Sequence, residues 1–132
     1  MNILDCDLLI VGGGAAGSRA AYEAKRTHPR LKVMIAVAGG YGSSGSTNLI
    51  ASESLGISAP YDYMKDGDGP DVFYQDILET GAGLSDPVLS RIVADEACAR
   101  VDELVALGVV FDRRESGIVQ CRLSGCTKAR SL

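Results

Sequence analysis

The chain has 132 residues, of which 46% are hydrophobic and 23% charged, the composition of one globular domain and not of a disordered or fibrous segment. Its formal charge of -4 at pH 7 argues against a surface that binds nucleic acid or anionic membrane, because either would need clustered Lys and Arg. We therefore expect small molecules or proteins as partners, and no nucleic acid.

Hydropathy and cysteine content bear on the cellular compartment. No apolar run approaches the roughly 20 residues of a membrane helix, so we expect no integral membrane segment. The sequence opens on no charged, then apolar, then small-residue leader, and its four cysteines fit free thiols in a reducing compartment. These features predict a cytoplasmic protein.

The beginning of the sequence has the pattern of a strand, a helix and a second strand. Residues 7–11 form a short apolar run typical of a strand buried on both faces of a parallel sheet. Helix formers follow over residues 15–27, and residues 31–37 form a second apolar run. Short connections and right-handed crossovers predict parallel strands, so residues 1–37 are expected to form a βαβ unit.

Residues 38–60 predict a long loop, since they are rich in Gly, Ser, Thr and Ala and show no helical period. Such a long loop within a compact domain is either disordered or wrapped around a ligand. Eight of the chain's 16 glycines lie within residues 12–45, which points to this part of the chain as the functional one.

Residues 61–132 predict a helical part with a terminal hairpin. A helix is expected over residues 70–81, and Asp86-Pro87 opens a longer one that ends at Gly108, with Asp at the cap and Pro in the first turn. Residues 109–111 and 118–121 predict the two strands of the hairpin. The apolar residues of the long helix recur at steps of three and four and predict one core-facing stripe: Leu89, Ile92, Val93, Ala97, Val101, Leu104 and Val105.

A glycine fingerprint follows the first predicted strand. Residues 12–17 read Gly-Gly-Gly-Ala-Ala-Gly and satisfy GxGxxG at the start of a predicted helix. In this setting the first Gly permits a tight turn, the second lets the backbone approach a pyrophosphate and the third lets the helix pack on the strand. The anion lies at the helix N-terminus. The alternative is a glycine-rich turn without a ligand. The candidate cofactor-binding residues here are Gly12, Gly14, Ala15, Ala16 and Gly17.

The acidic residue that completes such a site is missing. A dinucleotide-binding unit places a carboxylate about 20 positions after the glycines, where it binds the ribose hydroxyls. No Asp or Glu occurs between Glu23 and Glu53, and Val37 or a neighbour stands in its place. Four basic residues surround the far end of the helix, where they complement its C-terminus better than they serve an NADP phosphate: Lys25, Arg26, Arg30 and Lys32.

Four segments carry a resemblance that covers nearly the whole chain. They are residues 7–17, the Gly-Ser-Ser-Gly-Ser-Thr of 42–47, the Asp-Ile-Leu-Glu-Thr-Gly of 76–81 and the Leu-Ser-Asp-Pro of 84–87. In combination they resemble the N-terminal part of the fumarate reductase, succinate dehydrogenase and L-aspartate oxidase flavoprotein family. The resemblance implies an α/β fold, with a Rossmann-like βαβ unit, a long Gly/Ser loop and additional helices, as an incomplete flavoprotein domain.

The resemblance also implies FAD as cofactor. The glycines of the fingerprint would lie at its pyrophosphate, and four loop residues near the phosphates and flavin: Ser44, Gly45, Ser46 and Thr47. Family members with covalent flavin have a histidine immediately before this threonine. Ser46 stands there in this chain, so non-covalent FAD is expected.

The catalytic residues of the resembling enzymes lie beyond the end of this sequence, so no catalytic residue is assigned. The resemblance implies the FAD-binding portion of a fumarate reductase-like or aspartate oxidase-like oxidoreductase, truncated or split, with a second polypeptide carrying the rest of the fold. Its substrate would be dicarboxylate-like. One alternative is a non-enzymatic nucleotide-binding or interaction remnant of such an enzyme, and another is a small NAD(P)-binding domain.

No metal site is expected. His28 has no partner for catalysis or metal binding and is expected on the surface. Cys121 and Cys126 lack a second pair at zinc-like spacing. A solvated turn is expected for three acidic residues that lack the closing Glu of a calcium loop: Asp66, Asp68 and Asp71.

Overall fold

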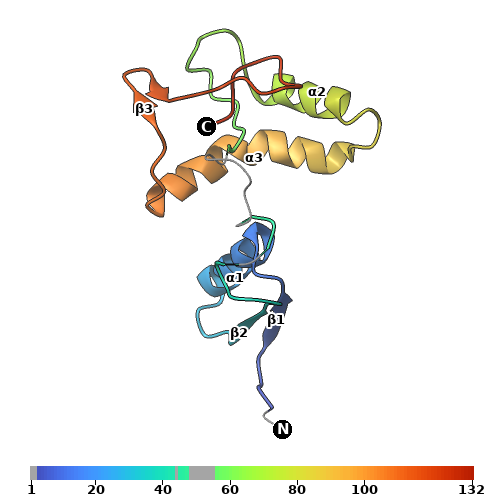
Figure 1. Ribbon diagram of the computed structural model, residues 1–132, viewed down its shortest axis with the longest axis vertical. Helices are drawn as coiled ribbons and strands as arrows, with labels where there is room; N and C mark the ends of the chain where they lie inside the picture. The colour runs from blue at the N-terminus through green and yellow to red at the C-terminus, as the bar shows by residue number, and fades with distance from the viewer. Residues whose placement is uncertain (1–2, 44, 48–55) are drawn as a thin grey trace. The chain divides into compact units, whose positions relative to one another are not determined.

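The computed structural model describes residues 3–43, 45–47 and 56–132. The chain divides into two compact units, Met1–Leu55 and Gly56–Leu132. In Figure 1 the first unit runs from blue to green and the second from green to red. Among the described residues, no helix has the length and apolar character needed to cross a membrane.

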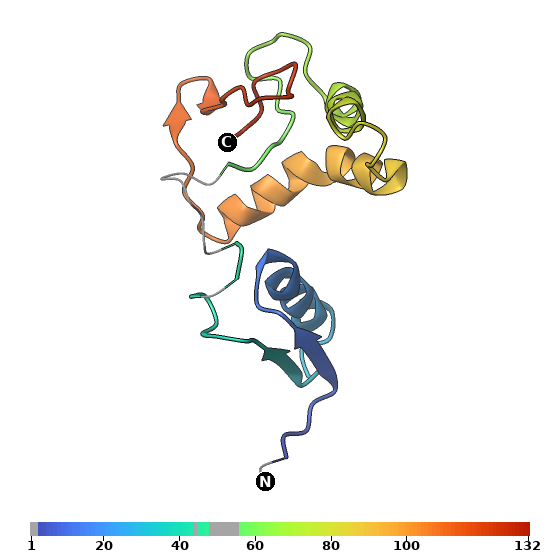
Figure 2. The same ribbon diagram turned by 45° about the vertical axis from the view of Figure 1, so that its right-hand side comes forward.

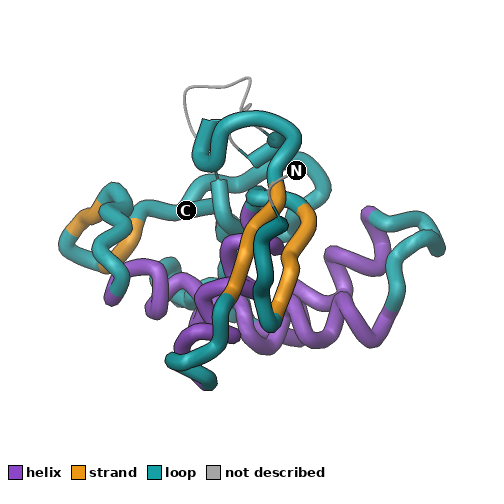
Figure 3. Tube along the Cα trace, turned by 90° about the horizontal axis from the view of Figure 1, so that it is seen from below, coloured by secondary structure: helices purple, strands orange, loops and turns teal. Residues whose placement is uncertain are grey.

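The first unit is a βαβ unit, as predicted. It consists of β1 (Leu8–Val11), α1 (Ala15–Thr27) and β2 (Val33–Ala36). The two strands lie side by side (Figure 3) and pair in parallel over their full length. At their amino ends the Lys32 N–H donates to the Asp7 carboxylate at 2.8 Å, which fixes where the pairing begins.

Only one face of the β1–β2 pair is covered within this unit. Leu8 and Ile10 are half-buried, whereas Leu9 and Val11 are 53% and 83% exposed. The prediction that the first strand is buried on both faces is therefore wrong for the described chain. The reason is that one helix and two strands supply only one covering layer.

The second unit is built on two helices that pack against each other (Figure 2): α2 (Pro70–Thr80) and α3 (Pro87–Ala106). The Asp86 carboxylate caps α3, accepting from the Val88 and Leu89 N–H groups at 2.8 and 3.0 Å, as the Asp-Pro pair predicts. Both helices lie within the predicted ranges.

The predicted apolar stripe of α3 is only partly correct. Val101 is fully buried and Ala97 and Val105 pack beside it, but Leu89, Ile92 and Val93 are 62%, 48% and 52% exposed. The buried residues in the first half of α3 are instead Ser90 and Ala94. Small side chains let neighbouring backbone approach closely, so the buried face of this half follows residue size and not the apolar period.

The terminal hairpin exists, but its strands differ from the prediction. They are β3 (Arg113–Arg114) and β4 (Gly117–Ile118), paired antiparallel with Arg113 opposite Ile118. The prediction of a strand over residues 109–111 is wrong. The turn needs only Glu115 and Ser116, because Gly117 adopts a φ of 137° that other residues rarely reach.

The core of the second unit consists of Ala59, Val101 and Ile118, with partly buried side chains around them. The end of the chain joins this core through backbone bonds: the Ala59 N–H donates to the Arg130 carbonyl at 2.9 Å, and the Leu132 N–H to the Ile57 carbonyl at 2.9 Å. The last residues are therefore an integral part of the unit.

A buried ionic cluster lies beside this segment. The fully buried Arg130 guanidinium donates to the Asp68 carboxylate at 2.6 and 3.1 Å and also to Asp76. Asp76 further accepts from the Thr127 N–H and hydroxyl at 2.8 and 2.9 Å. The prediction of a solvated turn is wrong for Asp68, whose side chain is 2% exposed, because a buried arginine needs a carboxylate partner.

Candidate functional site

The glycine turn connects the end of β1 to the start of α1. Gly12 has a φ of 103°, in the left-handed region that favours glycine, and its N–H donates to the Ala36 carbonyl at the end of β2. A Cβ added to Gly17 would lie 2.0 Å from the Gly12 carbonyl oxygen. The absence of a side chain at this position lets α1 pack directly on the turn.

A cavity of about 330 Å³ opens at this turn. Because Gly12 follows β1 and Val37 follows β2, the cavity lies at the carboxyl ends of both parallel strands. Ligands of open α/β sheets bind at this end. The cavity is lined by Gly12, Gly13, Gly14, Val37, Ala38, Gly45, Ser46 and Thr47.

Thr47 connects the Gly/Ser loop to the helix N-terminus. The first N–H groups of a helix have no acceptor within the helix, and the preceding Gly14 offers no side chain to cap them. The Ala15 N–H donates to the Thr47 hydroxyl oxygen at 3.2 Å. An added Cβ on Gly14 would lie 3.3 Å from the same oxygen. The hydroxyl thus stands beside backbone donors of the kind that bind phosphate oxygens.

The structure brings together most of the residues predicted for the site. Five of them line the cavity: Gly12, Gly14, Gly45, Ser46 and Thr47. Ala15 contributes its N–H through the bond to the threonine, and Gly17 contacts the backbone of the turn and not the cavity. Ala16 is exposed on α1 and outside the lining. Ser44 lies outside the described residues.

Sequence reasoning missed the packing over Gly13. A Cβ there would lie 2.6 Å from Val37 Cγ1 and 2.9 Å from Tyr41 Cδ2, so both side chains cover this glycine. The Tyr41 and Ser18 hydroxyl oxygens are 3.1 Å apart, within hydrogen-bonding distance. The one signal in the sequence is that Tyr41 is the only aromatic residue in the Gly/Ser-rich segment 38–47.

The lining formed by the described residues has no charged side chain. The basic residues of α1 gather in its last turn, where Lys25 donates to the Leu31 carbonyl at 3.1 Å. In this lining an anion therefore meets backbone N–H groups and the positive end of the α1 dipole, and no lysine or arginine.

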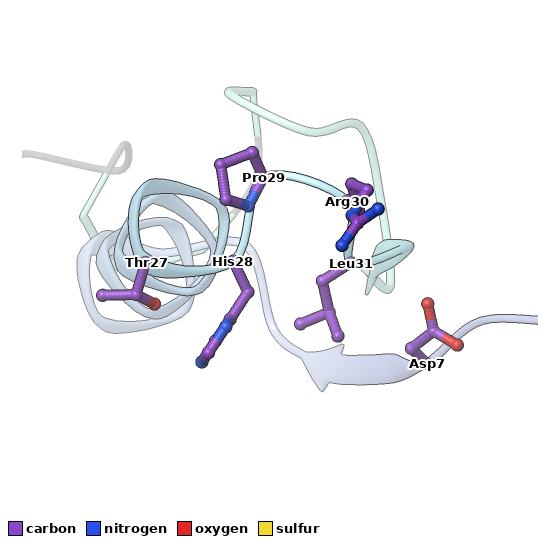
Figure 4. A pocket seen from close by; sticks show the side chains of 6 residues that line it. All are labelled: Asp7, Thr27, His28, Pro29, Arg30 and Leu31. Carbon is purple, nitrogen blue, oxygen red and sulfur yellow. The ribbon is translucent and has the colours of Figure 1, made fainter.

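A second hollow, of about 570 Å³, lies at the opposite end of the same unit (Figure 4). Asp7, His28 and Leu31 line it, where α1 ends and β1 is about to begin. The C-terminus of a helix carries partial negative charge and unpaired carbonyls, which disfavour a phosphate. The cavity at the glycine turn is therefore the candidate site.

Titratable groups elsewhere offer no competing centre. In the part of the chain that the structure describes, no group of three or more His, Cys, Asp or Glu is arranged to hold a metal ion. The four cysteines are free thiols.

Comparison with known proteins decides which ligand class the cavity belongs to. A family model described as an FAD binding domain matches residues 7–132. The chain belongs to this family. FAD is accordingly its cofactor, and its fold is that of the flavoprotein FAD-binding domain.

Curated relatives of this FAD-binding domain include several flavoproteins. It is 37% identical to a fumarate reductase (CoM/CoB) of Methanothermobacter marburgensis, over 94% of this chain and 22% of the matched polypeptide. It is 32% identical to the 8-methylmenaquinol:fumarate reductase flavoprotein of Wolinella succinogenes, over 94% and 19%. It is 32% identical to an L-aspartate oxidase of Nostoc, over 81% and 17%.

Solved structures share the fold. The Mycobacterium smegmatis Sdh1 complex in the apo form matches with a TM-score of 0.83 and 29% identity, over 95% of this chain and 20% of that one. A mutant of Escherichia coli quinol fumarate reductase FrdA matches with a TM-score of 0.83 and 26% identity, over 99% and 21%. This FAD-binding domain thus spans about one fifth of the length of its relatives.

The residues of the cavity fit the pyrophosphate of FAD. Three adjacent glycines leave the backbone uncovered by side chains of their own, and the first turn of α1 directs N–H groups toward the cavity. The Thr47 hydroxyl already occupies one acceptor position at that turn. Both features suit the oxygens of a phosphate.

Proposed function

We propose that this domain forms the FAD-binding part of a fumarate reductase-like or aspartate oxidase-like oxidoreductase. The cavity formed by the glycine turn and residues 45–47 carries the proposal, because it presents backbone donors at the helix N-terminus within a chain of the FAD binding domain family. The relatives named fumarate reductase and L-aspartate oxidase support the reaction class.

In this proposal each cavity residue has a defined role. Gly12 and Gly14 keep the turn tight and open to the pyrophosphate, and Gly17 holds α1 against it. Gly45, Ser46 and Thr47 cover the phosphates from the loop side. Bound FAD supplies hydride transfer to or from a dicarboxylate-like substrate. Ser46 offers no imidazole for attachment to the flavin, so the FAD is held without a covalent bond.

The substrate site belongs to the remainder of the flavoprotein fold. The described residues supply one wall of the cofactor site and assign no catalytic group. We infer that a further part of the fold, in the same or a second polypeptide, positions the substrate against the flavin. This part corresponds to the portion of the relatives that the chain does not span.

The Thr47 hydroxyl provides the test. Replacing Thr47 with Val keeps the shape of the side chain but removes the acceptor of the Ala15 N–H, and we expect FAD to bind about five- to tenfold more weakly, the worth of one hydrogen bond. Titration of the flavin fluorescence with the chain measures this affinity.

Thr27→Val is the matched control. Thr27 is the last residue of α1, its hydroxyl donates to the Glu23 carbonyl at 2.8 Å, and it lies at the end opposite the cavity. This variant should bind FAD within about twofold of the unchanged chain, since the removed bond is a local one. Equal affinities of the two variants, or no FAD binding by the unchanged chain, would contradict the proposal.

A further inference from the structure

The cavity holds an aliphatic side chain where a dinucleotide site usually holds a carboxylate. Val37 follows directly after β2, which ends at Ala36, and it lines the cavity together with Ala38. In βαβ dinucleotide sites an Asp or Glu at this place binds the ribose hydroxyls of adenosine. Within the described lining, neither a carboxylate nor a cation takes over this position.

The geometry holds Val37 in this position. Its Cγ1 lies over Gly13, as the 2.6 Å approach of an added Cβ shows, and the Tyr41 ring lies beside it. The Tyr41 and Ser18 hydroxyls, 3.1 Å apart, connect the segment that follows Val37 back to α1. The nearest preceding carboxylate in the sequence, Glu23, is engaged with Arg19 and Arg26 on α1.

The missing charge has a consequence for ligand choice. A carboxylate at this place accepts charge-assisted hydrogen bonds from the ribose hydroxyls and repels a phosphate on the 2′ position, so it both tightens binding and selects against 2′-phosphorylated nucleotides. An arginine would select for them. Valine does neither.

We propose that this cavity accepts adenine dinucleotides with and without a 2′-phosphate on the adenosine ribose, because Val37 replaces the selecting carboxylate. The proposal rests on the dinucleotide role proposed above and extends it to the adenosine end. The pyrophosphate contacts at the glycine turn are common to both ligand classes, so they give affinity without distinguishing the two.

ADP-ribose and 2′-phospho-ADP-ribose form the test pair, since they differ only in the 2′-phosphate. Isothermal titration of the chain should give dissociation constants within about threefold of each other, because no charge in the described lining senses the phosphate. In Val37→Glu, ADP-ribose should bind about tenfold tighter and 2′-phospho-ADP-ribose about tenfold weaker.

Two further variants separate charge from shape and from folding. Val37→Gln has nearly the same shape as the glutamate variant but no charge, so it should not weaken binding of 2′-phospho-ADP-ribose. Ala38→Glu places a carboxylate at an exposed position of the same lining and should restore selection if the half-buried Val37 does not tolerate glutamate.

Three results would overturn the proposal. One is a preference of about tenfold or more by the unchanged chain for either ligand. The second is folded glutamate variants at both positions that leave the ratio of the two affinities unchanged. The third is binding of neither ligand. If FAD also fails to bind, the proposed function falls together with the inference, whereas FAD binding with selection removes the inference alone.

Discussion

At the residue scale, the glycines of the turn divide into those with a steric reason that the sequence pattern reveals and those without. The GxGxxG spacing predicts Gly12, Gly14 and Gly17, and the structure gives Gly12 a positive φ and Gly17 a close backbone contact. Gly13 is the variable position of that pattern. Its constraint comes from Val37 and Tyr41, more than 20 residues away, which no local pattern encodes.

Replacing Gly17 with Ala tests the close contact of α1 with the turn. Alanine favours a helix, but its Cβ would lie 2.0 Å from the Gly12 carbonyl oxygen, so one of the two segments must move. We expect the free energy of unfolding to fall by about 1–3 kcal/mol, as for other overpacked sites. Chemical denaturation followed by circular dichroism measures it.

Ala20→Gly is the companion variant for this prediction, because Ala20 is an exposed residue of the same helix. It should lower the free energy of unfolding by only about 0.5–1 kcal/mol, the intrinsic cost of a glycine in a helix. A Gly17→Ala variant that is as stable as the unchanged chain would show that α1 does not press on the turn.

At the element scale, helix positions were predictable and buried faces were not. The start of α3 follows from Asp86 and Pro87, since a cap and a rigid first turn act locally. Which side of α3 is buried depends on the neighbouring chain, and small residues such as Ser90 and Ala94 are buried without an apolar signal. The hairpin shows the same limit, because Gly117 moves the turn into the predicted connection.

The contact of α2 with the final segment predicts a dependence of stability on pH. Burial raises the pKa of Asp76, but the hydrogen bonds from Thr127 and Arg130 outweigh it, and the net effect lowers this pKa. The unfolded value is about 3.9. Asp76 therefore stabilises the fold above about pH 4, and this contribution is lost as the pH falls through the folded pKa.

Asp76→Asn measures that contribution. The variant removes the charge opposite Arg130, so we expect lower stability at pH 6 and a shallower loss of stability between about pH 5 and 2 than in the unchanged chain. Asp71→Asn makes the same change on the same helix at a side chain that is 97% exposed, and it should alter neither. Parallel acid profiles for the Asp76 variant and the unchanged chain would refute the linkage.

At the scale of the whole molecule, the βαβ unit and its family follow from the sequence because they depend on the order of strand, glycine turn and helix. The predicted burial of β1 on both faces assumed a complete parallel sheet. The described first unit has one covering helix, and Leu9 and Val11 remain exposed on the other face. The buried cluster of Arg130 with Asp68 and Asp76 was likewise missed, since its members lie more than 50 residues apart.

The central claim is that FAD binds at the cavity between the glycine turn and residues 45–47. Titration of the ¹⁵N-labelled chain with FAD, followed by two-dimensional NMR, tests it most directly. The amide signals of Gly12, Gly13, Gly14 and Ala15 should shift in a saturable way, while those of Arg30 and Leu31 at the opposite hollow stay unchanged. No saturable shift, or shifts at the opposite hollow alone, would contradict the account.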